Sequence, residues 1–217
     1  MTGYCILPGC HKRAAGYSRL CETHRTRQRR HGAPDQRTIT KLDLKPFVQE
    51  VEAWMARNPG NMTWSSAEQR LSALLTGGSR VAQASMHGPT KRAALELQRV
   101  GVAAEGRTIV VIVLALYLMK EVNPSAFRSE RAFRLALARR VRSVSPLSFP
   151  RRNGADGRKR IASRELAPRE AEAFASLLIS ALGPIGVYIA GRRAAAELRA
   201  SEEKQKIQQY MNDLEFQ

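Results

Sequence analysis

The feature that most constrains this chain is a cluster of cysteines and one histidine within its first 24 residues. All three cysteines of the 217-residue sequence lie there, and Cys5, Cys10, Cys21 and His24 follow the spacing C-x4-C-x10-C-x2-H. Three thiolates and one imidazole suit tetrahedral zinc, and an odd number of cysteines cannot pair completely in disulfides. Pro8-Gly9 would aim the first two thiols at one point, and a helix beginning near Cys21 would place the other two ligands on one face. The sequence therefore predicts a structural Zn2+ with four protein ligands.

The fourth ligand has two alternatives in the sequence, because His11 and His31 lie close to His24. The stretch from Cys5 to Cys10, followed by Leu20-Cys21-Glu22-Thr23-His24 and a basic run, resembles a small treble-clef-type zinc module. Such modules occur at the N-termini of phage and mobile-element proteins, some of them HNH-family nucleases. The resemblance covers about the first 34 residues and implies that Cys5, Cys10, Cys21 and His24 are the ligands. It also implies nucleic-acid contact through the helix after Cys21, but it supplies no His-Asn-His nuclease set.

The charge of the chain is concentrated in two segments. The chain carries 36 Lys and Arg against 19 Asp and Glu, a net charge of +17. Nine basic and two acidic residues lie in 1–42, twelve and two lie in 123–164, and the rest balances at fifteen of each. Two concentrated basic segments on a neutral scaffold predict two anion-binding surfaces. We expect the partner to be nucleic acid, DNA more than RNA.

The composition and periodicity predict a mainly α fold: a small N-terminal zinc-binding module, then a helical domain and a C-terminal helix. The expected boundaries are 1–34 for the zinc module, 35–42 for a linker, 43–163 for the helical domain with a basic helix and a basic loop, and 164–217 for the C-terminal helices. Predicted helices cover about 43–57, 65–76, 89–102 and 108–121. Gly77-Gly78 is expected to stop the second of these. Gly183-Pro184 is expected to divide the C-terminal segment into two helices.

The basic helix follows a turn at Asn123-Pro124-Ser125 and has an apolar stripe containing Phe133, Leu137 and Val141. Arginines occupy its other side, so a buried helix, a turn and a basic helix follow in the order of a helix-turn-helix unit. The loop over 145–163 adds more basic residues. The predicted nucleic-acid contacts are Arg25, Arg27, Arg29 and Arg30 after the zinc ligands, Arg128, Arg131, Arg134, Arg139 and Arg142 around the basic helix, and Arg151, Arg152, Arg158, Lys159 and Arg160 in the loop.

No catalytic set stands out in the sequence, which has no glycine-rich phosphate loop, paired carboxylates or nucleophile motif. A tyrosine recombinase could use Tyr188 or Tyr210, but residues 88–217 contain no histidine to assist it. The sequence therefore predicts no enzyme. It predicts a sequence-specific or structure-specific nucleic-acid-binding protein that acts as a regulator or accessory factor of a phage or mobile element. The alternative is a DNA-processing enzyme, a nuclease or a recombinase, or an accessory subunit of one.

Two further expectations concern partners and location. Apolar residues recur at helical spacing near the C-terminus, so self-association or a partner protein is expected through 185–216. The longest apolar run, Ile109–Met119, has eleven residues and is too short to cross a bilayer, so no membrane is expected. The N-terminus lacks a signal-peptide pattern, which favours the cytoplasm of a bacterial or phage-infected cell. The C-terminal apolar residues are Ile207, Tyr210, Met211, Leu214 and Phe216.

Overall fold

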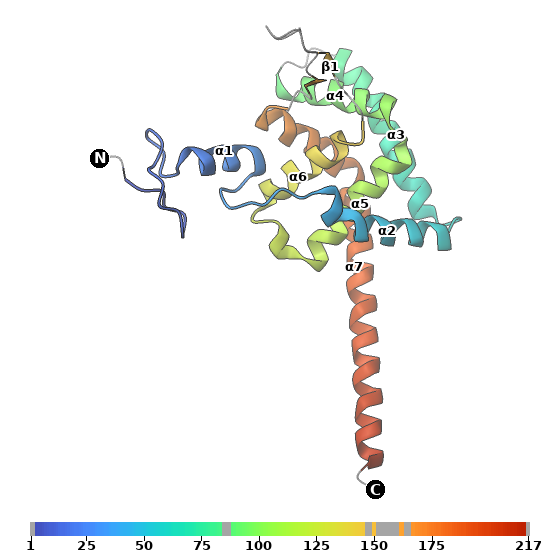
Figure 1. Cartoon of the computed structure of the whole chain (residues 1–217). Coiled ribbons are helices and arrows are strands. Elements are labelled where there is room, and N and C mark those ends of the chain that lie inside the picture. Colours follow the sequence, from blue (N-terminus) through green and yellow to red (C-terminus); the bar gives the residue numbers. More distant parts are fainter. Residues whose placement is uncertain (1–2, 84–87, 146–148, 151–160, 163–165, 216–217) are drawn as a thin grey trace.

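The structure is a computed structural model that describes residues 3–83, 88–145, 149–150, 161–162 and 166–215 (Figure 1). Almost all regular structure in these ranges is helical, which confirms the prediction of a mainly α fold with a Cys/His cluster at the N-terminus. The only β-strands in these ranges are β1 (Phe149–Pro150) and β2 (Ile161–Ala162), which pair antiparallel. The helices are α1 (Glu22–His31), α2 (Lys41–Arg57), α3 (Met62–Gln83), α4 (Pro89–Ala103), α5 (Gly106–Val122), the 3₁₀ helix η1 (Pro124–Ala126), α6 (Glu130–Arg142) and α7 (Pro168–Glu215).

Helix α5 is the centre of the core. Ten of its seventeen residues are buried, between Ile109 and Met119. Helices α2, α3, α6 and α7 all contact it, so apolar side chains are needed around its whole circumference. This arrangement explains why the segment reads as a continuous apolar run. The prediction that it forms a buried helix is confirmed.

Helix α7 runs through Gly183-Pro184, so the predicted break at this position is wrong. Gly183 and Gly186 face Tyr117 of α5. A Cβ at Gly183 would lie 2.9 Å from the Tyr117 hydroxyl oxygen, and a Cβ at Gly186 would overlap the tyrosine ring. The glycines therefore allow close packing of α7 against α5, and that contact offsets their low helix propensity.

Helix α3 likewise continues through Gly77-Gly78, so the stop predicted there is also wrong. Two glycines lower helix stability by about 1 kcal/mol each relative to alanine but do not block a helix. The helix gains more from its apolar face, where Trp64, Ala67 and Leu71 are buried in the main core. Burial of large side chains is worth about 1.5–3 kcal/mol each, which outweighs the two glycines.

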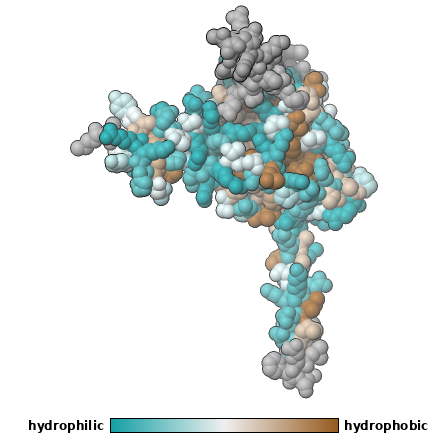
Figure 2. Space-filling model, in the orientation of Figure 1, coloured by the Kyte–Doolittle hydropathy of each residue, from teal (hydrophilic) through white to brown (hydrophobic). Residues whose placement is uncertain are grey.

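The C-terminal half of α7 projects away from the body of the molecule (Figure 1). Residues 195–209, 211 and 212 are all exposed, and Figure 2 shows a mainly hydrophilic surface there. The exceptions include Leu198, Ile207 and Met211, whose side chains face solvent. Helix α7 is also long and apolar enough over Pro168–Gln209 to cross a membrane, and half of its most apolar window is buried within the core. Helices α4 and α5 pass the same test only as a pair bent by 118°.

Candidate metal centre and basic surface

The first two cysteines flank a tight turn. The amide of Cys10 donates to the carbonyl of Leu7 at 3.1 Å, and Gly9 adopts φ +75°, as the third position of a type II turn after proline requires. A short antiparallel contact between Tyr4 and Arg13 closes the loop behind the turn. The turn therefore brings Cys5 and Cys10 to the same side of the chain, as the Pro8-Gly9 pair predicts.

The other two ligands come from the start of α1. Cys21 is the N-cap residue of this helix, and His24 lies one turn further on. The Cys21 sulfur lies 3.3 Å from Nδ1 of His24, the Cys5 sulfur lies 3.4 Å from the same nitrogen, and the Cys10 and Cys21 sulfurs are 3.8 Å apart. Tetrahedral zinc, with Zn–S bonds of about 2.3 Å, separates two thiolates by about 3.8 Å and a thiolate from an imidazole nitrogen by about 3.5 Å.

The four ligand atoms all lie within 4.8 Å of one another, so the cluster can hold a metal ion. This confirms the predicted grouping of Cys5, Cys10, Cys21 and His24. Of the alternative histidines, His11 is outside the cluster, and Nδ1 of His31 lies 2.6 Å from a guanidinium nitrogen of Arg139. No other group of three or more His, Cys, Asp or Glu side chains in the described ranges could hold a metal.

Backbone amides donate hydrogen bonds to the sulfurs of Cys5 and Cys10, which favours the thiolate form of each. Burial raises the pKa of the Cys5 thiol, but hydrogen bonds from the amides of Cys21 and Leu7, together with those of the His24 and Cys10 side chains, outweigh burial and lower that pKa from 9.0 to about 6. The amide of Lys12 lowers the pKa of Cys10, but burial and the neighbouring thiols outweigh it, so this pKa is raised. In both cases the amide two residues after the cysteine points at the sulfur. Such amides stabilise a thiolate, the form that binds metal.

The module around these ligands has almost no other core. Its cluster of buried residues consists of Cys5, Leu20 and Cys21, with Leu7 and Cys10 packed against it. Its larger side chains face outward, since Tyr4 is 70% exposed and Ile6 is 56% exposed. A segment of this size cannot bury enough apolar surface to be stable alone and usually needs a disulfide or a metal.

The C-terminal end of α1 docks on α6. Gly32 caps α1 with φ +92°, and a Cβ there would lie 2.6 Å from the backbone nitrogen of Ala132. Arg139 donates to the carbonyl of Arg30 at 3.1 Å and contacts His31. Helix α1 is therefore held in direct contact with the basic helix (Figure 1).

The segment 35–42, predicted as a linker, lies against the helical body at Gln36. This side chain is 3% exposed, donates to the carbonyl of Ala126 at 2.9 Å and accepts from the amide of Arg128 at 2.9 Å. An ion pair of 3.0 Å between Arg128 and Asp35 lies next to it. Sequence reasoning missed Gln36, since a lone glutamine in a polar stretch gives no signal of burial.

The arginines of α6 are more engaged with the protein than the sequence predicts. Arg142 is only 14% exposed and pairs with the buried Glu96 of α4 at 2.5 Å, so the expectation that it faces outward is wrong. The reason is that desolvated carboxylates need a cation. Phe133, Leu137 and Val141 are buried, as the apolar stripe predicts. Further ion pairs around α6 join described residues, among them Arg131 with Glu172, Arg134 with Glu130, and Lys120 with Glu130.

The arginines of α1 all lie on the surface. Arg27 and Arg29 are exposed, and no ion pair is made by either within the described part of the chain. Arg25 is half exposed and pairs with Glu22 of its own helix. Arg30 is exposed, and its backbone carbonyl accepts a hydrogen bond from the Arg139 guanidinium. The loop contacts Arg151, Arg152, Arg158, Lys159 and Arg160 lie outside the described residues.

Comparison with protein families, with curated proteins and with solved structures finds no match for this chain.

Proposed function

We propose that this protein is a non-catalytic nucleic-acid-binding protein in which a structural Zn2+ at Cys5, Cys10, Cys21 and His24 stabilises the small module that carries the basic helix α1. The observation that carries the proposal is the closed Cys3His cluster at the centre of a module with almost no other core. The resemblance to a treble-clef-type module of phage and mobile-element proteins supports a role as regulator or accessory factor.

The donor set favours zinc among the biological metals. Three thiolates with one imidazole in tetrahedral spacing suit Zn2+, whereas Mg2+ and Ca2+ take oxygen ligands. Four protein ligands leave no position for an activated water, so the metal would have a structural role. Metal binding and folding of the module would then be a single coupled event.

The charge of the module supports an anionic polymer as the partner. Residues 1–34 carry seven Lys or Arg against the single acid Glu22. Within this module Arg27 and Arg29 are exposed on α1, and their planar guanidinium groups suit phosphate oxygens. The arginines of α6 lie beside the end of α1, so the two basic segments of the sequence form neighbouring surfaces.

The metal is tested by elemental analysis after dialysis, which should give close to one zinc per chain. Cys21→Ser should lose the metal and the protection of residues 3–31 from hydrogen exchange, while far-ultraviolet circular dichroism keeps the helical signal of the body. A metal-free chain in which residues 3–31 stay protected would overturn the proposal of a structural zinc.

Binding is tested by titrating labelled duplex DNA and RNA at several salt concentrations. Each phosphate contact adds about 0.9 to the slope of log K against log salt, so Arg27→Gln with Arg29→Gln should lower the slope by about two. Arg57→Gln with Arg70→Gln is the matched control, since these exposed arginines lie on α2 and α3, away from α1. Equal effects of both double variants would show that only net charge matters and that α1 is no specific contact.

The enzymatic alternative is tested with the same samples. The bound nucleic acid should stay intact in the presence of magnesium, manganese or zinc, without covalent adducts. Neither Tyr188→Phe nor Tyr210→Phe should abolish binding. Nicking that survives repurification, or an adduct that either variant removes, would favour a nuclease or recombinase over the proposal.

A further inference from the structure

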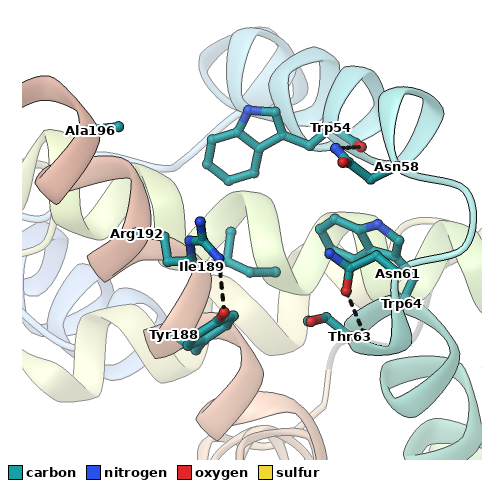
Figure 3. A pocket seen from close by; sticks show the side chains of 9 residues that line it. All are labelled: Trp54, Asn58, Asn61, Thr63, Trp64, Tyr188, Ile189, Arg192 and Ala196. Carbon is teal, nitrogen blue, oxygen red and sulfur yellow. Dashed lines mark hydrogen bonds between the residues drawn. The ribbon is translucent and has the colours of Figure 1, made fainter. Parts of the chain in front are cut away.

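A pocket of about 310 Å3 lies between α2, the start of α3 and the middle of α7 (Figure 3). It is separate from the metal cluster and from α1, since its lining residues belong to 54–64 and 188–196. Its volume is at the lower end of the roughly 300–1,000 Å3 of small-molecule sites, which suits a ligand with one or two rings. The proposed function makes no use of this pocket.

Aromatic rings form much of its wall. The chain has only two tryptophans, and both Trp54 and Trp64 line the pocket together with Tyr188. Trp64 is 8% exposed, so its ring is fixed by the core, whereas Tyr188 is 52% exposed at the rim. Figure 3 shows the three rings coming from different elements around a common space. Rings in this arrangement offer flat faces to a planar ligand.

The charge at the pocket is positive. Arg192 is the only charged residue among the described residues that line it. Its guanidinium donates to the Tyr188 hydroxyl at 3.1 Å and lies 5.9 Å from the centre of that ring, so the side chain is held at the rim (Figure 3). An aromatic cage for an ammonium ligand would exclude such a cation. The pocket therefore favours a planar ligand that carries a negative group.

Two asparagines complete the chemistry. Asn58 Nδ2 donates to the carbonyl of Trp54 at 3.1 Å, which leaves its Oδ1 as an acceptor. Asn61 Oδ1 accepts from the amide of Thr63 at 2.8 Å, which leaves its Nδ2 as a donor. One oriented acceptor and one oriented donor match the edge of a nucleobase, which presents both kinds of group.

We propose that this pocket binds a nucleotide, with the base against the aromatic rings and the amides of Asn58 and Asn61, and the phosphate on Arg192. The ligand is either a free mononucleotide or an unpaired nucleotide of a strand, and both offer the same base and phosphate. The inference stands independently of the proposed function, because a free nucleotide needs neither the zinc module nor α1.

Intrinsic tryptophan fluorescence tests the pocket directly, because both tryptophans of the chain line it. With excitation at the red edge of indole absorption, AMP, CMP, GMP and UMP are titrated separately into the full-length protein. At least one nucleotide should quench the emission saturably, since base stacking changes the indole environment. Ribose 5-phosphate, which has no base, should leave the emission unchanged.

Variants separate the phosphate contact from a general charge effect. Arg192→Gln should weaken binding of the nucleotide at least tenfold and leave binding of the matching nucleoside within about twofold, since only the nucleotide loses a charge-assisted hydrogen bond to its phosphate. Arg192→Lys should restore part of the loss. Arg199→Gln, an exposed arginine further along the same helix, is the matched control and should leave both affinities unchanged. Circular dichroism confirms that each variant is folded.

The source of the ligand follows from two further titrations. A single-stranded tetranucleotide that quenches more tightly than its mononucleotide identifies an unpaired nucleotide of a strand, and equal affinities identify a free nucleotide. The inference is overturned by an absence of quenching at millimolar nucleotide, by equal quenching with ribose 5-phosphate, or by an Arg199→Gln effect as large as that of Arg192→Gln. If salt-dependent DNA binding persists in those cases, the proposed function survives without the pocket.

Discussion

The junction between the zinc module and the body depends on Gly32, and Gly32→Ala tests how firmly the two are joined. The new Cβ would lie 2.6–2.9 Å from backbone atoms of Arg131 and Ala132, which cannot rotate away as a side chain could. The residue also has φ +92°, where alanine costs about 1–2 kcal/mol. We therefore expect α1 to separate from α6.

The expected magnitude follows from the contacts that separation removes. Two hydrogen bonds of Arg139, to Arg30 and His31, contribute about 0.5–1.5 kcal/mol each. Together with the backbone strain, docking should weaken by about 2–5 kcal/mol, which raises the opening equilibrium about 30- to 5,000-fold. Zinc content should stay unchanged, because Gly32 lies outside the ligand cluster.

Hydrogen exchange measures the opening through the amide of Arg128, which donates to Gln36 across the junction. The amide of Arg128 and the amides of the facing segment, residues 30–37, should exchange faster in Gly32→Ala. Gly16→Ala is the matched control, since Gly16 also has a positive φ, +58°, but no atom within 4 Å of its Cβ. Unchanged exchange in Gly32→Ala, or equal acceleration in both variants, would refute close packing at the junction.

The remaining predictions concern stability and assembly. Arg142→Gln should lower the free energy of unfolding in urea by about 2–3 kcal/mol. This loss is smaller than that of a fully broken buried pair, because Arg99 stays 3.5 Å from Glu96. The salt slope of DNA binding should be unchanged. Hydrogen bonds from the backbone amide and the hydroxyl of Thr40 lower the pKa of Asp43 from 3.8. The Asp43 carboxylate therefore stabilises the folded protein fully above pH 3.8, and progressively less as the pH falls through the lowered pKa of the folded state. Asp43→Asn should therefore destabilise at neutral pH and not in strong acid, as thermal melts at both will show. Removal of residues 201–217 should leave the melting temperature of the body unchanged, since the residues described there are exposed, and light scattering will show whether it dissociates an oligomer.

The metal cluster was predictable because its information is local. The four ligands lie within twenty residues, and a turn and one helical turn are enough to bring them together. The choice of His24 over His11 and His31 also follows from the helix that begins after Cys21. The mainly α fold and the buried α5 were predictable for a related reason, since long apolar or amphipathic runs report their own burial.

The environment of the arginines was not predictable, because their partners come from remote helices. Glu96 is 46 residues from Arg142, and Glu172 is 41 residues from Arg131. A helical wheel shows only the side on which an arginine lies, and says nothing of the carboxylate that a neighbouring helix supplies.

The glycines of α7 failed as signals for a different reason. The low helix propensity of Gly183 predicts a break in the helix, but the helix continues because the glycine packs closely against Tyr117. The pocket also stayed hidden, since Trp54 and Tyr188 are far apart in sequence and each reads as an ordinary core or surface aromatic.

The continuity of α7 makes the C-terminal end a fixed spacer. A helix of 48 residues is about 72 Å long, and the same helix lines the pocket and carries Ile207 and Met211 at its far end. With no joint between them, the angular position of the far end is set by the number of residues in between. Deleting one residue near position 200 would rotate that end by about 100° and draw it in by about 1.5 Å, whereas deleting seven would nearly restore the angle and shorten the reach by about 10 Å. For a partner that must touch both the tip and the body, the seven-residue deletion would keep the tip facing nearly the same direction. The one-residue deletion would instead keep the distance between tip and body nearly the same.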